Sequence, residues 1–318
     1  MANEIDQRGW LKSLTVANYR CVRGATLTLT PLHALIGPND SGKSTLLAAI
    51  KSLSESVRQR GPRGMPEGSM LLGQTSNGKT VRFDVPSKGS IVAEPLPMLE
   101  EAFLFRPDPD FLRRPSALLS AAQPIRFQDE RGLGLPAIID TIRDRNLTGP
   151  LVELNEELRR LFPTVDLLQL RAVSGSQKAI GVKLRNGVEV PAEQMSEGLL
   201  YYLAFWALSR IDPPIPIVLV EEPENGLHPA RIKDVMAVLK EASKTTQIVL
   251  ATHSPFVINE LEGHQVSVVT RTPEEGTKVT LLSDTPHFAE RSKVYALGEL
   301  WVSYADGKLE EPLLSSHE

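Results

Sequence analysis

The stretch GPNDSGKST, at residues 37–45, decides the fold of this chain. It matches the pattern G-x-x-x-x-G-K-[ST], whose fixed positions are filled by Gly37, Gly42, Lys43 and Ser44. An apolar run at 32–36 precedes it and a helix-prone run at 45–53 follows it. This order predicts a strand, a loop and a helix. We expect the loop to turn its backbone N–H groups towards the phosphates of a nucleoside triphosphate, at the N-terminus of the helix.

Two side chains of this loop have specific tasks in phosphoryl transfer. Lys43 is expected to reach the β- and γ-phosphates, and Ser44 is expected to ligate Mg²⁺. The predicted phosphate-binding residues are Gly37, Pro38, Asn39, Asp40, Ser41, Gly42, Lys43, Ser44 and Thr45. On its own, the loop predicts only that a nucleoside triphosphate binds.

Composition narrows the class of protein. Hydrophobic residues make up 41% of the chain, enough for a sizeable core. No apolar run approaches the roughly 20 residues of a membrane span, and the polar start MANEIDQRGW lacks the apolar segment of a signal peptide. The single cysteine, Cys21, excludes an internal disulfide and suits a reducing compartment. We therefore expect a cytoplasmic protein without a membrane partner. The net charge of −4 gives no overall case for nucleic acid.

The first two thirds of the chain combine short strands with a long, proline-rich interval at 54–190. Two strands at 11–18 and 25–29 are expected to pair, ahead of the loop-bearing strand. Within the interval, 80–85 and 90–94 resemble a hairpin, and 95–115 is expected to be irregular. Helices are predicted at 135–145 and 150–162, and strands at 167–173, 179–184 and 188–190.

The last third alternates strands with helices. Ser196 is a good N-cap for a helix at 199–210. Buried strands are predicted at 217–220 and 247–250, with an amphipathic helix at 230–243 between them, and two more strands within 266–282. Strand, helix, strand is the pattern of a parallel α/β sheet, which collects ligands at the carboxyl ends of its strands.

Polar residues follow two of these buried strands. Glu221 and Glu222 end the first, and we expect Glu221 to hold Mg²⁺ and Glu222 to polarise the attacking water. The alternative is an acidic turn in solvent. His253 follows the second strand and can donate to a γ-phosphate oxygen, although a lone histidine is often purely structural. Arg20, beside Tyr19, either contacts the nucleotide or lies in an exposed turn.

The ordered set of motifs resembles the ABC-type ATPase heads of the SMC, RecF and OLD kind, and most of all the stand-alone OLD-like bacterial AAA ATPases that lack a Toprim domain. The matching segments are NYR (18–20), GPNDSGKST (37–45), MSEG (195–198), IVLVEEPENGLHP (217–229) and ATHSP (251–255). The resemblance implies an α/β P-loop NTPase fold of the ABC-ATPase type, with a mixed sheet, an antiparallel β part and a helical or irregular insert.

The resemblance also implies roles for these segments. Ser196, Glu197 and Gly198 correspond to the signature, which in such heads contacts the γ-phosphate held by a second subunit, so that two ATP molecules lie inside a homodimer. Residues 225–228 correspond to the loop that crosses the dimer interface, and His253 to the switch histidine. Asp40 stands where such heads commonly have a small residue, and its charge is expected to weaken ATP binding unless the side chain points away. Gln123 and Gln128 both remain candidates for the glutamine loop.

The implied organisation is a single head over 1–318. Its nucleotide-binding lobe comprises 1–53 and 211–318, and an inserted arm with the signature helix comprises 54–210. The 65 residues after His253 hold no acidic cluster followed by Asp-x-Asp, so we expect no nuclease chemistry in this chain.

Three functions stay open at this stage. The first is an ATP-hydrolysing dimeric switch that regulates a separate effector protein, such as a nuclease, or acts on DNA in bacterial anti-phage defence or DNA maintenance. The others are the ATPase subunit of a membrane transporter and a scaffold that binds nucleotide without hydrolysis. DNA would need a basic face, for which the insert offers arginines interleaved with acids. They are Arg106, Arg113, Arg114, Arg126, Arg131, Arg143, Arg145, Arg159 and Arg160.

Overall fold

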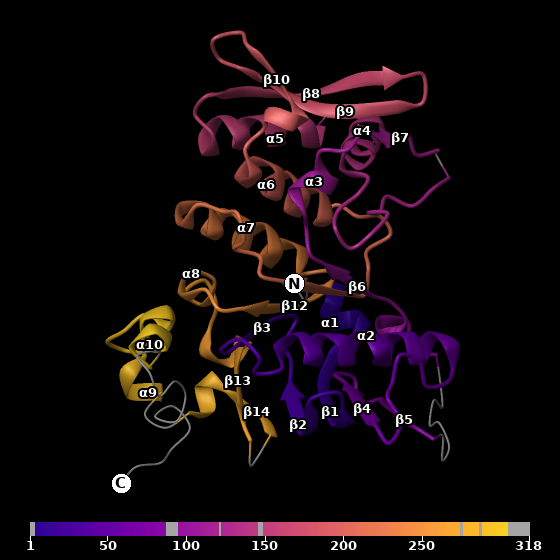
Figure 1. The fold of residues 1–318 in the computed structure, drawn as a ribbon, viewed down its shortest axis with the longest axis vertical. Coiled ribbons are helices and arrows are strands. Elements are labelled where there is room, and N and C mark those ends of the chain that lie inside the picture. Colours follow the sequence, from indigo (N-terminus) through magenta and orange to yellow (C-terminus); the bar gives the residue numbers. More distant parts are fainter. Residues whose placement is uncertain are drawn as a thin grey trace. The chain divides into compact units, whose positions relative to one another are not determined.

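The computed structural model describes residues 4–86, 95–120, 122–145, 149–273, 276–285 and 288–304. These residues form two compact units, which Figure 1 labels element by element. The first unit runs to Leu104 and includes Ile215–Glu224 and the chain from Lys240 onwards. The second comprises Phe105–Pro214 and Asn225–Leu239. Each unit is described by itself below.

A six-stranded sheet organises the first unit. Its strand order is β14 (Gly276–Leu281), β13 (Val266–Thr272), β3 (Leu32–Ile36), β12 (Gln247–Thr252), β11 (Ile217–Glu221) and β6 (Ala102–Phe105). The four strands from β13 to β11 are parallel, and β14 returns antiparallel to β13. Strands β3 and β12 are buried along their whole length, which is why they read as continuous apolar runs rather than alternating ones.

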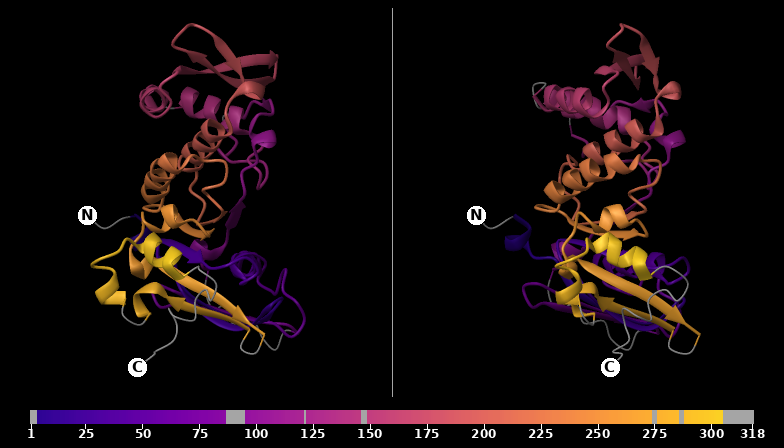
Figure 2. Two further views of the ribbon diagram at one scale, coloured as in Figure 1. Left: turned by 60° about the vertical axis from the view of Figure 1, so that its left-hand side comes forward. Right: turned by 90° about the vertical axis from the view of Figure 1, so that its left-hand side faces the viewer.

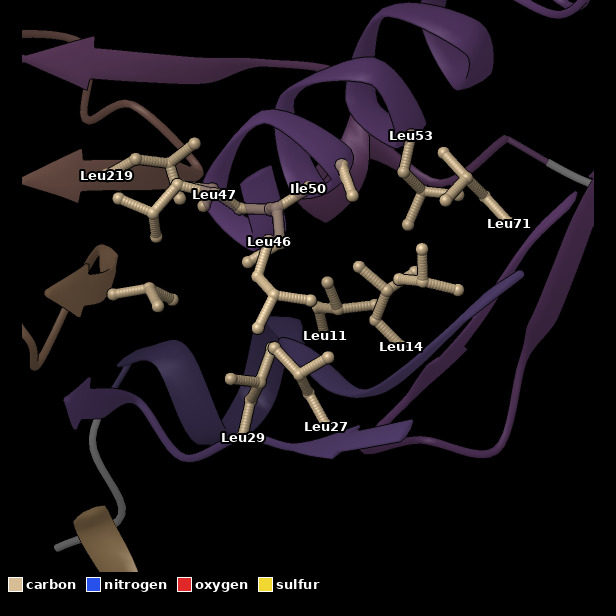
Figure 3. Packing of buried hydrophobic residues seen from close by; sticks show 14 of the residues in the cluster. Leu11, Leu14, Leu27, Leu29, Leu46, Leu47, Ile50, Leu53, Leu71 and Leu219 are labelled. Carbon is tan, nitrogen blue, oxygen red and sulfur yellow. The ribbon is translucent and has the colours of Figure 1, made fainter. Parts of the chain in front are cut away.

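A second, antiparallel sheet completes the first unit. Its order is β2 (Val22–Thr28), β1 (Leu11–Tyr19), β4 (Met70–Thr75) and β5 (Thr80–Asp84). Helix α2 (Lys43–Gln59) begins at the loop after β3 and buries Leu46, Leu47 and Ile50 in one core cluster with side chains from both sheets. Figure 3 shows the side chains of Leu46, Leu47 and Ile50 between Leu219 of β11 and the leucines of β1 and β2. The core therefore fixes the loop through the helix that follows it.

The second unit contains an antiparallel sheet backed by helices. Strands β10 (Glu189–Pro191), β9 (Gln177–Leu184) and β7 (Ser116–Ala117) are neighbours, and β8 (Val165–Ser174) also pairs with β9. Helices α4 (Leu135–Arg145) and α5 (Gly149–Leu161) lie against one face of it (Figure 2). On α5 the leucines at 151, 154, 158 and 161 are all buried, as their helical spacing predicts. Helix α6 (Glu197–Leu208) is buried at every position from Leu199 onwards.

The remaining elements are mostly short. The helices are α1 (Glu4–Arg8), α3 (Pro109–Leu112), α7 (Pro229–Ala242), α8 (Pro255–Ile258), α9 (Phe288–Arg291) and α10 (Leu297–Tyr304). The 3-10 turns are η1 (Pro97–Leu99), η2 (Ala192–Gln194), η3 (Gly263–Gln265) and η4 (Leu282–Asp284). Within the described ranges, no helix is long and apolar enough to span a bilayer.

The predicted fold class, an α/β P-loop head with mixed and antiparallel sheets, is confirmed. Two details differ. The partner of the strand at 80–84 is β4, while residues 90–94 lie outside the described part of the chain. The segment 95–115 is not wholly irregular, because it contributes β6 to the edge of the main sheet and the short helix α3. The lobe boundary at residue 53 stays a prediction, and β4 and β5 beyond it belong to the sheet of the first unit.

Candidate functional site

The loop between β3 and α2 is shaped by close approaches that only glycine permits. A Cβ atom on Gly37 would lie 2.1 Å from the carbonyl oxygen of Val269. Gly42 caps α2 in the left-handed region, at φ 110°. Asp40 is also left-handed, at φ 65°, a conformation that aspartate tolerates better than most residues. The motif therefore folds as a tight loop at the N-terminus of a long helix.

A cavity of about 500 Å³ lies along this loop, within the range of roughly 300–1,000 Å³ that is common for small-molecule sites. It belongs to the first unit. Lys43 and Ser44 line it from the loop, and Glu221 and Glu222 line it from the end of β11. Asn39, Asp40, Gly42, Thr45, Cys21, Ala251 and Arg271 complete the lining. Residues of the loop and of β11 line one cavity because β3, β12 and β11 are parallel, so that their carboxyl ends lie at the same edge of the sheet.

Lys43 and Ser44, the predicted phosphate and metal contacts, both line the cavity. The ammonium group of Lys43 donates to the carbonyl oxygens of Gly37 and Pro38, each at 2.7 Å, so it lies over the loop. Ser44 is exposed and Glu221 is half-buried on the same cavity. Hydroxyl and carboxylate oxygens suit Mg²⁺, which takes few protein ligands and completes its shell with phosphates and water. The described residues contain no group of three or more His, Cys, Asp or Glu that could hold a metal ion by themselves.

Glu222 has an unusual backbone. It is left-handed at φ 47°, and its N–H donates to the carbonyl oxygen of Ala251 at 2.8 Å. A non-glycine residue in this region costs on the order of 1–3 kcal/mol and persists only where its surroundings enforce it. Such residues gather at active sites, so the backbone supports the role predicted for Glu222.

His253 lies beside the carboxylates but outside the cavity lining. Its Nδ1 is 3.7 Å from Oε1 of Glu222 and 3.8 Å from Oε1 of Glu224. The side chain is 53% exposed, so its approach to Glu222 is not forced by burial in a core. The structure thus brings the predicted switch histidine next to the predicted water-polarising acid.

The signature residues begin α6 in the second unit. Ser196 occupies the predicted N-cap position, although its side chain makes no capping hydrogen bond there. Ser196 and Glu197 are exposed. A Cβ on Gly198 would lie 3.5 Å from the carbonyl oxygen of Gly226, and a Cβ on Gly226 would lie 2.2 Å from the ring of Tyr201. The 225–228 loop therefore packs closely on the first turns of the signature helix.

Tyr19 and Arg20, at the turn between β1 and β2, differ in burial. Tyr19 is fully buried, and its hydroxyl is 2.8 Å from Oγ of Ser52, so it belongs to the core. Arg20 is exposed at φ 52°, with its guanidinium carbon 5.4 Å from the centre of the Tyr19 ring. Arg20 is not among the residues that line the cavity. Its contact with nucleotide stays a prediction.

Sequence reasoning missed three residues of this region. Sγ of Cys21 is 3.1 Å from Oγ1 of Thr45, and Arg271 donates from Nη1 to the carbonyl oxygen of Asp40 at 3.5 Å. Arg271 lies in the carboxyl half of β13 and reaches the cavity because β13 pairs with β3, a neighbour relation that no local sequence pattern shows. Glu224 accepts hydrogen bonds from the 252–253 turn.

Many arginines of the second unit are paired with acids. Arg113 contacts Asp110, Arg143 contacts Asp140 and Asp144, Arg145 contacts Asp212, Arg159 contacts Asp166, and Arg160 contacts Asp234. This agrees with the interleaved acids of the sequence and favours a salt-bridged surface. DNA binding stays a prediction.

The two glutamine-loop candidates have local contacts. Gln123 accepts a hydrogen bond from the N–H of Ser120 at 2.7 Å, and the Gln128 side chain packs on Gly134.

Comparison with known proteins identifies the class of this site. Residues 95–259, just over half of the chain, match the family described as "AAA domain, putative AbiEii toxin, Type IV TA system", and residues 10–84 match an AAA ATPase domain. The OLD nuclease of Thermus scotoductus is 27% identical over 77% of this chain. The chain spans 59% of that relative's length. The phosphate import ATP-binding protein PstB of Pyrobaculum aerophilum is 24% identical over 76% of this chain and 78% of its own.

A solved structure has the same fold. The Smc head domain with an extended coiled coil, bound to the C-terminal domain of ScpA from Pyrococcus furiosus, has a TM-score of 0.55 and 14% identity, covering 86% of this chain and 96% of that one. The chain is thus a P-loop ATPase head of the AAA/ABC type, with the fold of the Smc head and with sequence similarity to part of an OLD nuclease. It belongs to the family described as an AAA domain, putative AbiEii toxin, of type IV toxin–antitoxin systems.

Proposed function

We propose that this chain hydrolyses ATP and acts as a dimeric switch that controls a separate effector protein in the bacterial cytoplasm. The observation that carries the proposal is the single cavity on which Lys43, Ser44, Glu221 and Glu222 meet. Hydrolysis of a phosphoanhydride needs a cation on the phosphates, oxygen ligands for Mg²⁺ and a group that orients the attacking water, and these four side chains can supply them.

In the proposed reaction, Lys43 holds the β- and γ-phosphates and Glu222 accepts a hydrogen bond from the attacking water, which orients it in line with the bond to be broken. Water adds to the γ-phosphorus, the bond to the β-phosphate oxygen breaks, and ADP and inorganic phosphate result. Mg²⁺ held by Ser44 and Glu221 would neutralise developing negative charge on the phosphate oxygens. His253, which lies 3.7 Å from Glu222, would donate to a γ-phosphate oxygen.

The dimer completes the site in this proposal. The signature residues Ser196 and Glu197 are exposed at the start of α6, where backbone N–H groups and the helix dipole favour an anion. A second copy of the chain would place them on the γ-phosphate, so that ATP joins the two copies and its hydrolysis releases them. The ATP-bound and ADP-bound forms would then differ in assembly, which is what a switch requires.

Two comparisons support an effector in a defence setting. The matched family description refers to a type IV toxin–antitoxin system. The OLD relative is named a nuclease, and its chain is longer than this one. The similar Smc head is bound to another protein, ScpA. We therefore propose a protein effector, of which a nuclease is the first candidate. The similarity to PstB keeps a transporter partner as the second candidate, and an integral membrane protein in the purified native complex would favour it.

The test is the dependence of ATP turnover on protein concentration. A dimeric site predicts that phosphate release per chain rises with concentration and then saturates, while Lys43→Ala stays inactive and monomeric at saturating ATP. A rate per chain that is constant over a concentration range in which light scattering shows only monomers would reject the dimeric site. If the wild-type dimer releases no phosphate, hydrolysis is rejected, and the alternative of a scaffold that binds nucleotide without hydrolysis remains.

A further inference from the structure

The loop after Glu222 carries a third acid, Glu224, whose contacts differ from those of the other two. Oε1 of Glu224 accepts a hydrogen bond from Oγ1 of Thr252 at 2.6 Å and one from the backbone N–H of His253 at 3.3 Å. Oγ1 of Thr252 accepts from the N–H of Ser254 at 3.0 Å. One carboxylate oxygen is thereby tied to all three residues of the turn that presents His253.

This arrangement links two loops that the sheet alone does not hold in place. Strands β11 and β12 are in parallel register up to the pair Glu221 and Ala251. Beyond that pair the ladder stops, and the only further backbone bond between the two segments runs from Glu222 N–H to Ala251 among the described hydrogen bonds. The geometry of His253 relative to Glu222 therefore depends on side-chain contacts, and one of these is the 2.6 Å hydrogen bond from Thr252 to Glu224.

The side chain of Glu224 is nearly buried, so its hydrogen bonds are shielded from water. Its side chain is 9% exposed, and its second oxygen, Oε2, is buried without a hydrogen-bond partner among the described residues. A buried polar atom without a partner disfavours the folded state. Thr252 is itself fully buried, so the contact is shielded from water.

We propose that Glu224 is a positioning residue, which holds the Thr252–His253–Ser254 turn so that His253 faces Glu222. The proposal rests on the proposed ATPase function. It requires one oxygen acceptor at this position, not a net charge. Glu224→Gln keeps such an acceptor and is expected to retain most of the turnover, whereas Glu224→Ala removes it. Thr252→Val and Thr252→Ser form the matching pair on the other side of the contact.

The test combines turnover with a readout that needs no activity. Glu224→Ala and Thr252→Val should each lower kcat roughly 10- to 100-fold, because small displacements of catalytic groups have effects of this size. ATP affinity and KM should change by less than about 3-fold, because Lys43 and its loop are untouched. Glu224→Gln and Thr252→Ser should recover most of the loss. Glu241→Ala, an exposed acid on α7, is the control.

Amide hydrogen exchange of the peptide that contains 251–256 is the second measurement, made on the nucleotide-free protein. Exchange should accelerate in Glu224→Ala and not in Glu224→Gln. Unchanged exchange together with a wild-type kcat in Glu224→Ala would overturn the inference. If the wild-type protein hydrolyses no ATP, the proposed function fails, while the exchange result still decides whether Glu224 holds the turn. If Glu224→Ala does not fold, kcat and amide hydrogen exchange are measured on Thr252→Val and Thr252→Ser instead, with the same expected difference between the two variants.

Discussion

The backbone N–H of Glu222 donates to the carbonyl oxygen of Ala251 at 2.8 Å, and the backbone of Glu222 is left-handed at φ 47°. The bond extends the contact between β11 and β12 by one residue beyond their last paired positions, Glu221 and Ala251. A carboxylate side chain is thus held at the cavity by a strained main chain. Several consequences of this site can be measured.

Replacement of Glu222 by glutamine should separate ATP binding from hydrolysis. Glutamine is nearly the same size, so the loop should keep its shape, but the amide is a far weaker base than the carboxylate. Glu222→Gln should therefore accumulate as an ATP-bound dimer, visible as a doubled mass in light scattering with ATP and as a monomer with ADP. A variant that stays monomeric at saturating ATP would contradict the sandwich arrangement.

Asp40 should weaken ATP binding through its charge. It is exposed, lines the phosphate cavity and lies in the left-handed region at φ 65°. Asn and Gly both tolerate that backbone and remove the charge, so Asp40→Asn and Asp40→Gly should bind ATP about 2- to 10-fold more tightly. Asp40→Val, β-branched at the same φ, should bind more weakly. Titration with a fluorescent ATP analogue checks this, and equal affinity in the wild type, Asn and Gly proteins would remove the charge argument.

Gly226 should be essential for the packing of the 225–228 loop on the signature helix. It has φ +67°, and an added Cβ would lie 2.2 Å from the ring of Tyr201. Gly226→Ala should lower the free energy of unfolding by about 1–3 kcal/mol, from overpacking and left-handed strain together. Gly198→Ala, where a Cβ finds ordinary contact at 3.5 Å, is the matched control. Equal denaturation midpoints for the two variants would show that Tyr201 moves aside without cost.

His33 should make stability depend on pH below neutrality. It is fully buried in β3, and burial, with the positive charge of His264 as a second cause, lowers the pKa of His33 from 6.5 to about 3. The unfolded chain therefore binds a proton between these values that the folded chain does not. Its contribution to stability is complete above pH 6.5 and decreases as the pH falls towards 3.

The expected slope from this residue is about 1.4 kcal/mol per pH unit in that window. Its ring also contacts Oγ of Ser267 at 2.9 Å, so His33→Gln is the variant that keeps a polar partner there. Urea unfolding at pH 7, 6 and 5 measures the effect. The wild type should lose more stability on acidification than His33→Gln, and parallel curves would contradict the assignment.

Much of the fold follows from local patterns in the sequence. The phosphate loop and β3 are predictable because a fixed motif and a continuous apolar run coincide. The buried stripe on α5 follows from helical spacing, and β11 and β12 follow from apolar runs that end in polar residues. Strand β6 was not predictable, since its four residues AFLF lie among prolines and gain their pairing from the edge of a distant sheet.

The candidate site was predictable only in part, for a related reason. Glu221 ends β11, and Glu222 and His253 directly follow β11 and β12, so all three could be placed at one sheet edge from the sequence. Cys21 and Arg271 join the cavity because β13 lies beside β3 and the β1–β2 turn approaches Thr45. Such neighbours depend on strand order and loop shape, which no local pattern encodes. The same holds for Glu224, whose partner Thr252 is on another strand.

The most direct test of the account is phosphate release at saturating ATP and Mg²⁺ by the wild-type chain and by Glu222→Gln, at a concentration at which the wild type dimerises. The account predicts steady turnover by the wild type and a rate lower by roughly 10²- to 10⁴-fold in Glu222→Gln, with ATP binding retained. Equal rates in the two proteins, or no release from the wild type, would contradict it.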